Sequence, residues 1–247
     1  SDAEEIKRLM KNVFDCNINT IFTAYTSIDE IEKTTEGQIN LVLRREGLKA
    51  ATTLQKEYNM NYYYGRPYGL EGTTRWLREI EKMLGITANE DYINKKTKEL
   101  RKHITSYKFM VREIKNKSVI LVGDYDVVIG LANLVEELGL KVEGIIVKHK
   151  LSKEVKNLIP EKWKDIIKID LNERRLEEYL SSTPSYLLLA DGATLKLDNK
   201  SKLHLQIANP NFSKYNIYPY TPFVGYNGVL HIIQCLIELE RNRIKTP

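Results

Sequence analysis

The stretch that decides the fold is Ser118-Val119-Ile120-Leu121-Val122-Gly123, which is followed by an apolar stretch at helical spacing, Val127–Leu138. A short, fully apolar run that ends at a glycine is typical of a strand buried on both faces. The next apolar run, Val142–Val147, has the same character. Strands of this kind joined by helices form parallel sheets covered on both sides, so this part of the chain predicts an α/β fold.

The same alternation extends outward in both directions. Toward the carboxyl end we expect helices near Ser152–Leu158, Glu173–Leu180 and Val229–Leu236, strands at Ile166–Ile169 and Tyr186–Leu189, and an extended run at Leu203–Ala208. Toward the amino end we expect helices at Asp2–Val13, Gly47–Tyr58 and Glu71–Leu84, with strands at Ile18–Tyr25, Gln38–Leu43 and Asn61–Tyr64. A helical region at Asn89–Lys115 separates the two series. The sequence therefore predicts two Rossmann-like, doubly wound parallel-sheet domains, 1–115 and 116–247.

Composition excludes several classes of protein. The 247 residues are 42% hydrophobic and 29% charged with a formal net charge of +5, and no basic stripe with interleaved aromatic residues indicates nucleic-acid binding. No apolar run of membrane-spanning length is present, so we expect no membrane partner. The two cysteines, Cys16 and Cys235, have no CxxC partner, which argues against a metal site in this chain and fits a cytoplasmic protein. The opening Ser1–Glu5 lacks an initiator Met and a signal peptide, so we expect part of a longer protein.

Candidate chemistry lies in the loops that follow the predicted strands, because ligands of parallel sheets bind beyond the strands' carboxyl ends. Five such loops contain a glycine: Arg44–Gly47, Gly65–Gly69, Gly123–Asp126, Ala190–Gly192 and Phe223–Gly228. The loops lack the GxGxxG, GxxxxGK[ST] and GxSxG motifs of dinucleotide, nucleotide triphosphate and nucleophile-elbow sites. Arg44 could hold an anion or form an ion pair. Asp126 is predicted to cap the following helix.

The order of several motifs resembles the middle and last domains of nitrogenase component 1-type proteins. The run Gln38–Leu43, the helix opening at Gly47-Leu48, and Pro67-Tyr68-Gly69 before a helix resemble the middle domain. Gly123-Asp124 after a strand, and Pro222–Gly228 before an amphipathic helix, resemble the last domain. The family comprises molybdenum–iron protein subunits, cofactor-assembly scaffolds, and protochlorophyllide and chlorin reductases, with a branch that acts on a nickel tetrapyrrole.

The resemblance implies partners and cofactors that this chain does not itself supply. It implies pairing with a homologous component 1-type subunit, as a homo- or heterodimer, and electron delivery by an ATP-dependent iron-protein reductase. It places the iron–sulfur cysteines in an N-terminal domain outside this chain. The family's cluster cysteine corresponds to Arg44 and its cluster histidine to Val224, so we expect no metal ligand and no cofactor within this chain. Cleft-lining candidates are Arg44, Gly69, Gly123, Asp124, Val224, Gly225, Tyr226 and Gly228.

These inferences favour one hypothesis and leave two others open. The favoured one is the cavity-forming portion of a nitrogenase component 1-like oxidoreductase subunit or cofactor-assembly scaffold, inactive without its iron–sulfur domain. One alternative is a two-lobed small-ligand binding protein of periplasmic type, and the other is a two-domain glycosyltransferase.

Overall fold

The computed structural model describes residues 2–22, 26–110, 115–208 and 221–245. The contacts of the chain divide it into two compact units. The first comprises Ser1–Leu100 with Tyr218–Val229, and the second comprises Arg101–Ile217 with Leu230–Pro247. The predicted domain boundary, between Lys115 and Asn116, remains a prediction.

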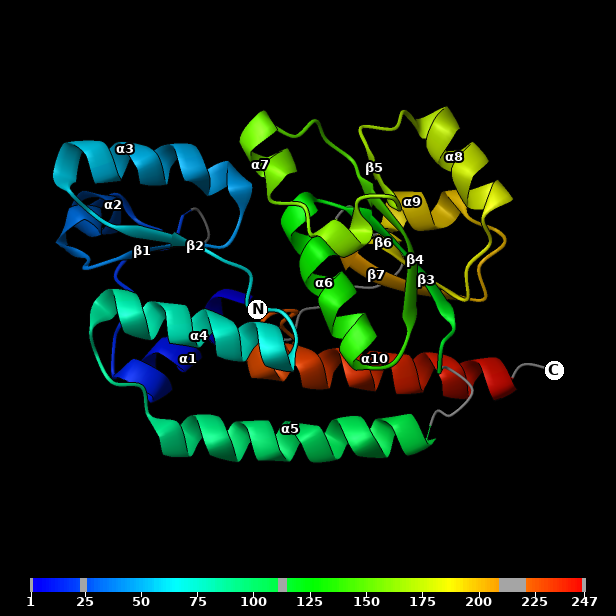
Figure 1. Cartoon of the computed structure of the whole chain (residues 1–247), viewed down its shortest axis with the longest axis horizontal. Helices are drawn as coiled ribbons and strands as arrows, with labels where there is room; N and C mark the ends of the chain where they lie inside the picture. Colours follow the sequence, from blue (N-terminus) through cyan, green and yellow to red (C-terminus); the bar gives the residue numbers. More distant parts are fainter. Residues whose placement is uncertain (1, 23–25, 111–114, 209–220, 246–247) are drawn as a thin grey trace. The chain divides into compact units, whose positions relative to one another are not determined.

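The first unit carries a two-stranded parallel sheet with helices around it (Figure 1). Strands β1 and β2 pair in the register Asn40↔Tyr62 to Val42↔Tyr64. The elements of the unit are α1 (Asp2–Phe14), α2 (Ile28–Glu32), η1 (Lys33–Glu36), β1 (Asn40–Val42), η2 (Arg45–Gly47), α3 (Leu48–Tyr58), β2 (Tyr62–Tyr64) and α4 (Leu70–Leu84).

One predicted strand of this unit is wrong. The described part of Ile18–Tyr25 has no regular secondary structure, and residues 23–25 lie outside the described residues. Side chains hold this segment in place of a strand ladder: Asn19 Nδ2 donates to the Lys33 carbonyl at 2.9 Å, and Thr20 Oγ1 donates to the Glu30 carbonyl at 2.6 Å. Such side-chain bonds to the backbone compete with strand pairing.

Helix α4 illustrates how the sequence sets the helices of the first unit. Its buried face contains Trp76, Leu77 and Ile80, which recur at helical spacing. The helix ends at Gly85, whose φ of 64° is the left-handed conformation that glycine adopts without steric strain. Pattern and terminator agree, and the predicted helix is confirmed to within one residue.

The second unit is built on a five-stranded parallel sheet in the order β5-β4-β3-β6-β7 (Figure 1). Its elements are β3 (Ser118–Gly123), α6 (Tyr125–Glu137), β4 (Lys141–Val147), α7 (Lys153–Asn157), η4 (Glu161–Trp163), β5 (Ile167–Ile169), α8 (Glu173–Ser182), β6 (Leu187–Asp191), α9 (Gly192–Leu197) and β7 (Leu203–Ala208). Both units are Rossmann-type α/β structures, which confirms the predicted fold class.

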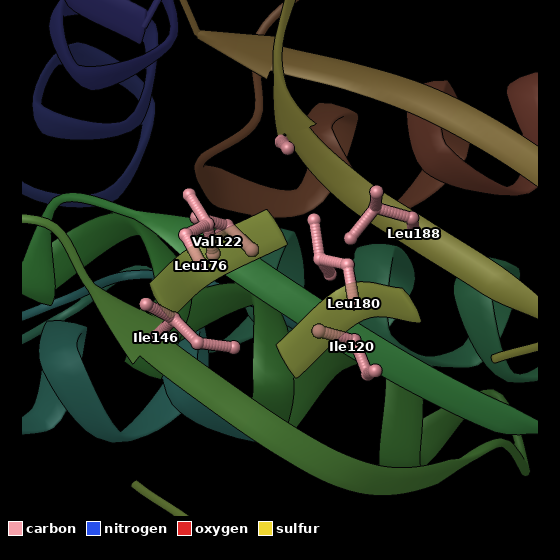
Figure 2. Packing of buried hydrophobic residues seen from close by; sticks show 7 residues of the cluster. Ile120, Val122, Ile146, Leu176, Leu180 and Leu188 are labelled. Atoms are coloured by element: carbon pink, nitrogen blue, oxygen red, sulfur yellow. The ribbon is translucent and has the colours of Figure 1, made fainter. Parts of the chain in front are cut away.

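The core of the second unit packs α8 onto the middle of the sheet, as Figure 2 shows. Leu176 and Leu180 of α8 contact a cluster of strand residues that are almost fully buried. The strand members of the cluster are Ile120, Val122, Ile146, Leu188 and Ala190. Because alternate side chains of a strand point to opposite faces, the apolar runs of β3 and β6 supply both faces of the sheet.

Two long helices contain residues of both units: α5 (Glu90–Met110) and α10 (Gly225–Lys245). The predicted Asn89–Lys115 helix is described as far as Met110, and residues 111–114 lie outside the described residues. The sequence also predicts an aromatic loop at Tyr215–Phe223, most of which lies outside the described residues. None of the described helices combines the length and hydropathy needed to cross a membrane.

Candidate functional site

The carboxyl edge of the five-stranded sheet is the place where this fold builds binding sites. The chain runs from β3 outward to β4 and β5, then returns to the other side of β3 as β6. In parallel α/β sheets this reversal opens a crevice beyond the carboxyl ends of the two diverging strands. Gly123 ends β3 and Asp191 ends β6, so both stand at this reversal point.

A network of hydrogen bonds centres on Asp191. Its Oδ1 accepts from the backbone N–H groups of Ala193 and Thr194, both at 3.0 Å, and thereby caps α9. Its Oδ2 accepts from the Thr194 hydroxyl at 2.9 Å and from Lys148 Nζ at 2.7 Å. Lys148 directly follows β4, so the pair joins the ends of β4 and β6 across β3.

Asp191 is held as a carboxylate. Burial alone would raise the pKa of Asp191, but the hydrogen bonds from Lys148 and Thr194 outweigh it, and the net pKa lies below the usual value. The Asp191 side chain is 3% exposed, whereas that of Lys148 is 35% exposed. The edge therefore has a fixed, buried negative charge and a partly accessible ammonium group.

Asp124 also lies at this edge, as predicted, but its role differs from that of Asp126. Helix α6 begins at Tyr125, so Asp124 occupies the cap position and Asp126 lies inside the first turn. The prediction that Asp126 caps the helix is therefore wrong. The Asp124 side chain makes no capping bond, and its Oδ1 lies 3.2 Å from His149 Nε2.

The remaining predicted site residues belong to the first unit, where Gly69 and Gly225 lie in adjoining loops. Gly69 has a φ of 77° and precedes α4, and its carbonyl accepts from the Thr73 N–H at 3.2 Å. Gly225 N donates to the Pro67 carbonyl at 2.6 Å. Thr73 Oγ1 donates to the same carbonyl at 3.1 Å. The two predicted loops, 65–69 and 223–228, are thus joined at Pro67.

Gly225 is required by its surroundings. It has a φ of 72°, and a Cβ at this position would lie 2.4 Å from Glu5 Oε1. Glu5 is 3% exposed and forms a two-bonded pair with Arg8, at 2.9 Å to Nε and 2.7 Å to Nη2. Its Oε1 also accepts from the Asn227 N–H at 3.1 Å, which satisfies a donor in the first turn of α10.

The neighbours of Gly225 are also buried and closely packed. Val224 and Tyr226 are 2% and 1% exposed, and the Tyr226 hydroxyl lies 3.1 Å from Thr74 Oγ1. At Gly228 a Cβ would lie 2.4 Å from the Phe223 carbonyl oxygen. This segment therefore fixes the start of α10 against α1 and α4.

Arg44, the last of the predicted site residues, follows β1 in the first unit. Its carbonyl accepts from Gly47 N at 3.0 Å. Its place in a crevice with Val224 stays a prediction.

Lys148 and Glu5 were not among the predicted site residues. Lys148 was detectable as a charged residue directly after a fully apolar strand. Glu5 was detectable because it lies on the apolar face of its helix with Leu9 and Met10. In the described ranges, no three His, Cys, Asp or Glu side chains are grouped so that they could hold a metal ion.

This geometry defines a two-unit, Rossmann-type α/β protein. The segments of Gly69 and Gly225, which meet at Pro67 where α10 begins, form what we call the glycine junction. Residues 1–239 match the family model described as nitrogenase component 1 type oxidoreductase, and the chain belongs to that family. A solved structure titled "Nitrogenase Cp1 at pH 6.5" is similar, with a TM-score of 0.79 and 19% identity, over 99% of this chain and 58% of that one.

Two curated relatives match the chain over most of its length. One of them, a light-independent protochlorophyllide reductase subunit of Leptolyngbya boryana, is 27% identical over 95% of this chain and 48% of its own length. The other, the nitrogenase molybdenum-iron protein beta chain of Methanococcus maripaludis, is 26% identical over 74% of this chain and 40% of its own length. The chain spans about half the length, or less, of these relatives.

Proposed function

We propose that this chain is the cavity-forming portion of a nitrogenase component 1-like oxidoreductase subunit or of a related cofactor-assembly scaffold. The observation that carries the proposal is the family match over residues 1–239, combined with a span of about half the length of the relatives. Family membership supports redox chemistry. The remaining length of the relatives is where an iron–sulfur portion would lie, and the proposed location is the cytoplasm.

The residues of this chain do not fit the iron–molybdenum cofactor of the family's namesake. The resemblance assigns its two protein ligands to the positions of Arg44 and Val224. A guanidinium is cationic and an isopropyl group has no lone pair, so neither side chain coordinates a metal. These two positions therefore cannot hold that cofactor. What this chain contributes is binding surface, and the Lys148 ammonium at the sheet edge can orient an anionic group of a substrate.

The proposed partners are a homologous component 1-type subunit and an ATP-dependent iron-protein reductase. The names of the two relatives support the first, because a reductase subunit and a beta chain are each components of a larger assembly. The test is anaerobic purification of the chain alone and after co-expression with a component 1-type polypeptide that carries the cysteine-rich portion. Each preparation then receives the iron protein, ATP and protochlorophyllide as the probe substrate.

The chain alone is expected to bind no iron and to reduce nothing. The co-expressed pair is expected to co-purify and to show an iron–sulfur signal in electron paramagnetic resonance. Lys148→Met removes the ammonium that is proposed to orient the substrate, so it tests that role in the co-expressed pair. Lys153→Met, in α7, is its matched control. Substrate reduction by the isolated chain, or failure of every component 1-type polypeptide to associate with it, would overturn the proposal.

A further inference from the structure

A cavity of about 340 Å³ lies in the second unit between α9, β7 and α10. Helix α10 lines it with residues at the spacing i, i+3, i+4, i+7, which is one helical face. That face consists of Cys235, Glu238, Leu239 and Asn242. The volume is at the lower end of the range for small-molecule sites.

Strand β7 gives the cavity its polar wall. Its side chains alternate between buried and partly exposed, so Leu203, Leu205 and Ile207 are buried while His204 and Gln206 share the other face. β7 is the edge strand of the sheet, and its two partly exposed polar residues lie where α9 and α10 leave a hollow.

A buried carboxylate fixes the orientation of His204. Asp198 Oδ2 lies 2.9 Å from His204 Nε2, and the Asp198 side chain is 1% exposed. Backbone N–H groups of Lys200 and Ser201 also donate to Asp198, at 3.1 and 3.2 Å. Burial raises the pKa of Asp198, but these hydrogen bonds and that of His204 outweigh burial. The net pKa of Asp198 lies below its usual value, so the group is a carboxylate.

A carboxylate only accepts hydrogen bonds, so the shared proton belongs to His204 Nε2. In the neutral imidazole, Nδ1 is then an acceptor, and it points away from Asp198 because the two nitrogens lie on opposite sides of the ring. Within the described part of the chain, Nδ1 has no hydrogen-bond partner. The His204 side chain is 34% exposed and lines the cavity.

We propose that this cavity binds a small molecule with an apolar body and a hydroxyl group, which donates a hydrogen bond to His204 Nδ1. Leu195 and Leu239 supply apolar wall for the body of the ligand. The Glu238 carboxylate is a second acceptor, which already receives a bond from Gln234 at 2.7 Å. The proposal rests on residues of the second unit alone and does not depend on the proposed redox function.

The probe is phenol, and toluene is its isostere without the hydroxyl. Nuclear magnetic resonance titrations at about pH 8, where histidine side chains are largely neutral, are expected to show saturable phenol binding with a Kd on the order of 1 mM. Toluene is expected to bind about tenfold more weakly, because it leaves Nδ1 unpaired. The nitrogen-15 spectrum is expected to show Nε2 protonated and the Nδ1 resonance moving as phenol is added.

Two variants separate this hydrogen bond from simple cavity filling. His204→Phe keeps an aromatic ring but loses the Nδ1 acceptor, so the preference for phenol over toluene is expected to fall severalfold. The amide of Asp198→Asn can donate to Nε2, so the proton of His204 is no longer fixed on Nε2 and Nδ1 is no longer always the acceptor. The preference for phenol over toluene is therefore expected to fall severalfold. His103→Phe, an exposed position in α5, is the matched control and should leave both affinities unchanged.

Three results would each overturn the proposal. They are equal affinity of the unaltered protein for phenol and toluene, chemical-shift changes that map away from β7 and α10, and an unchanged preference in both variants. The nitrogen-15 measurement is made on the unaltered protein, so the proposal stays testable even if a variant fails to fold.

Discussion

Replacing Gly225 with alanine tests whether the glycine junction holds the first unit together. Two separable effects contribute to the expected loss. The left-handed backbone, at a φ of 72°, costs an alanine roughly 1–2 kcal/mol. The new Cβ would also lie 2.4 Å from Glu5 Oε1, so Glu5 must move and its bonds to Arg8 and Asn227 are strained or lost. Disrupting a buried, paired carboxylate adds about 2 kcal/mol.

The expected total for Gly225→Ala is therefore about 3–4 kcal/mol of unfolding free energy. Gly85→Ala is the matched control, because Gly85 has a φ of 64° but open space around its Cβ position, and it should lose only the backbone cost of roughly 1–2 kcal/mol. The assay is urea unfolding followed by the fluorescence of Trp76 in a Trp163→Phe background, so that the signal reports on the first unit.

The double variant Glu5→Ala/Gly225→Ala closes the cycle. Removing the Glu5 side chain removes the collision, so the unfolding free energy lost in the double variant should be smaller than the sum of the two single-variant losses. Equal losses for Gly225→Ala and Gly85→Ala would refute the argument, because they would leave only backbone strain.

Three further outcomes follow from the second unit. Asp191→Ala should lose about 3 kcal/mol near neutral pH; because the folded pKa of Asp191 is lowered, this difference is present above the unfolded value of about 3.9 and should shrink in acid unfolding titrations as pH falls through the folded value. Asn172→Ala removes the cap that accepts from Arg175 N at 2.9 Å and should cost about 1 kcal/mol in urea unfolding. Leu188→Ala should lower the unfolding free energy by about 3 kcal/mol, whereas Leu158→Ala, at a half-exposed position, should change it by less than about 0.5 kcal/mol.

The elements that could be predicted are those whose pattern is decided locally. The prediction of β3 was correct at both ends because six residues of strand character end at a glycine before a helical pattern. Ser27 and Glu30 have the sequence spacing of a capping box, and the structure contains both of its bonds, which span only three residues. Helix α9 was missed because its six residues are too few to show a helical period.

The site was less predictable, because its contacts depend on strand order and on the path of the chain. Lys148 and Asp191 are 43 residues apart and meet only once β6 returns beside β3. Glu5 and Asn227 are 222 residues apart. The sequence identified the glycines as candidate loop and cleft-lining residues, but it did not show that Gly225 accommodates a carboxylate from the first helix.

The bonds from α1 to the segment before α10 have a consequence for how the chain is made. Asp2 Oδ1 accepts from Phe223 N at 2.7 Å, so two segments that lie 221 residues apart in the sequence complete the same unit. During synthesis, the bonds of Asp2 and Glu5 to this segment can form only after the second sheet has been translated. A polypeptide that stops at residue 115 would lack these partners of Asp2 and Glu5, and we expect it to aggregate where the 247-residue chain stays dispersed.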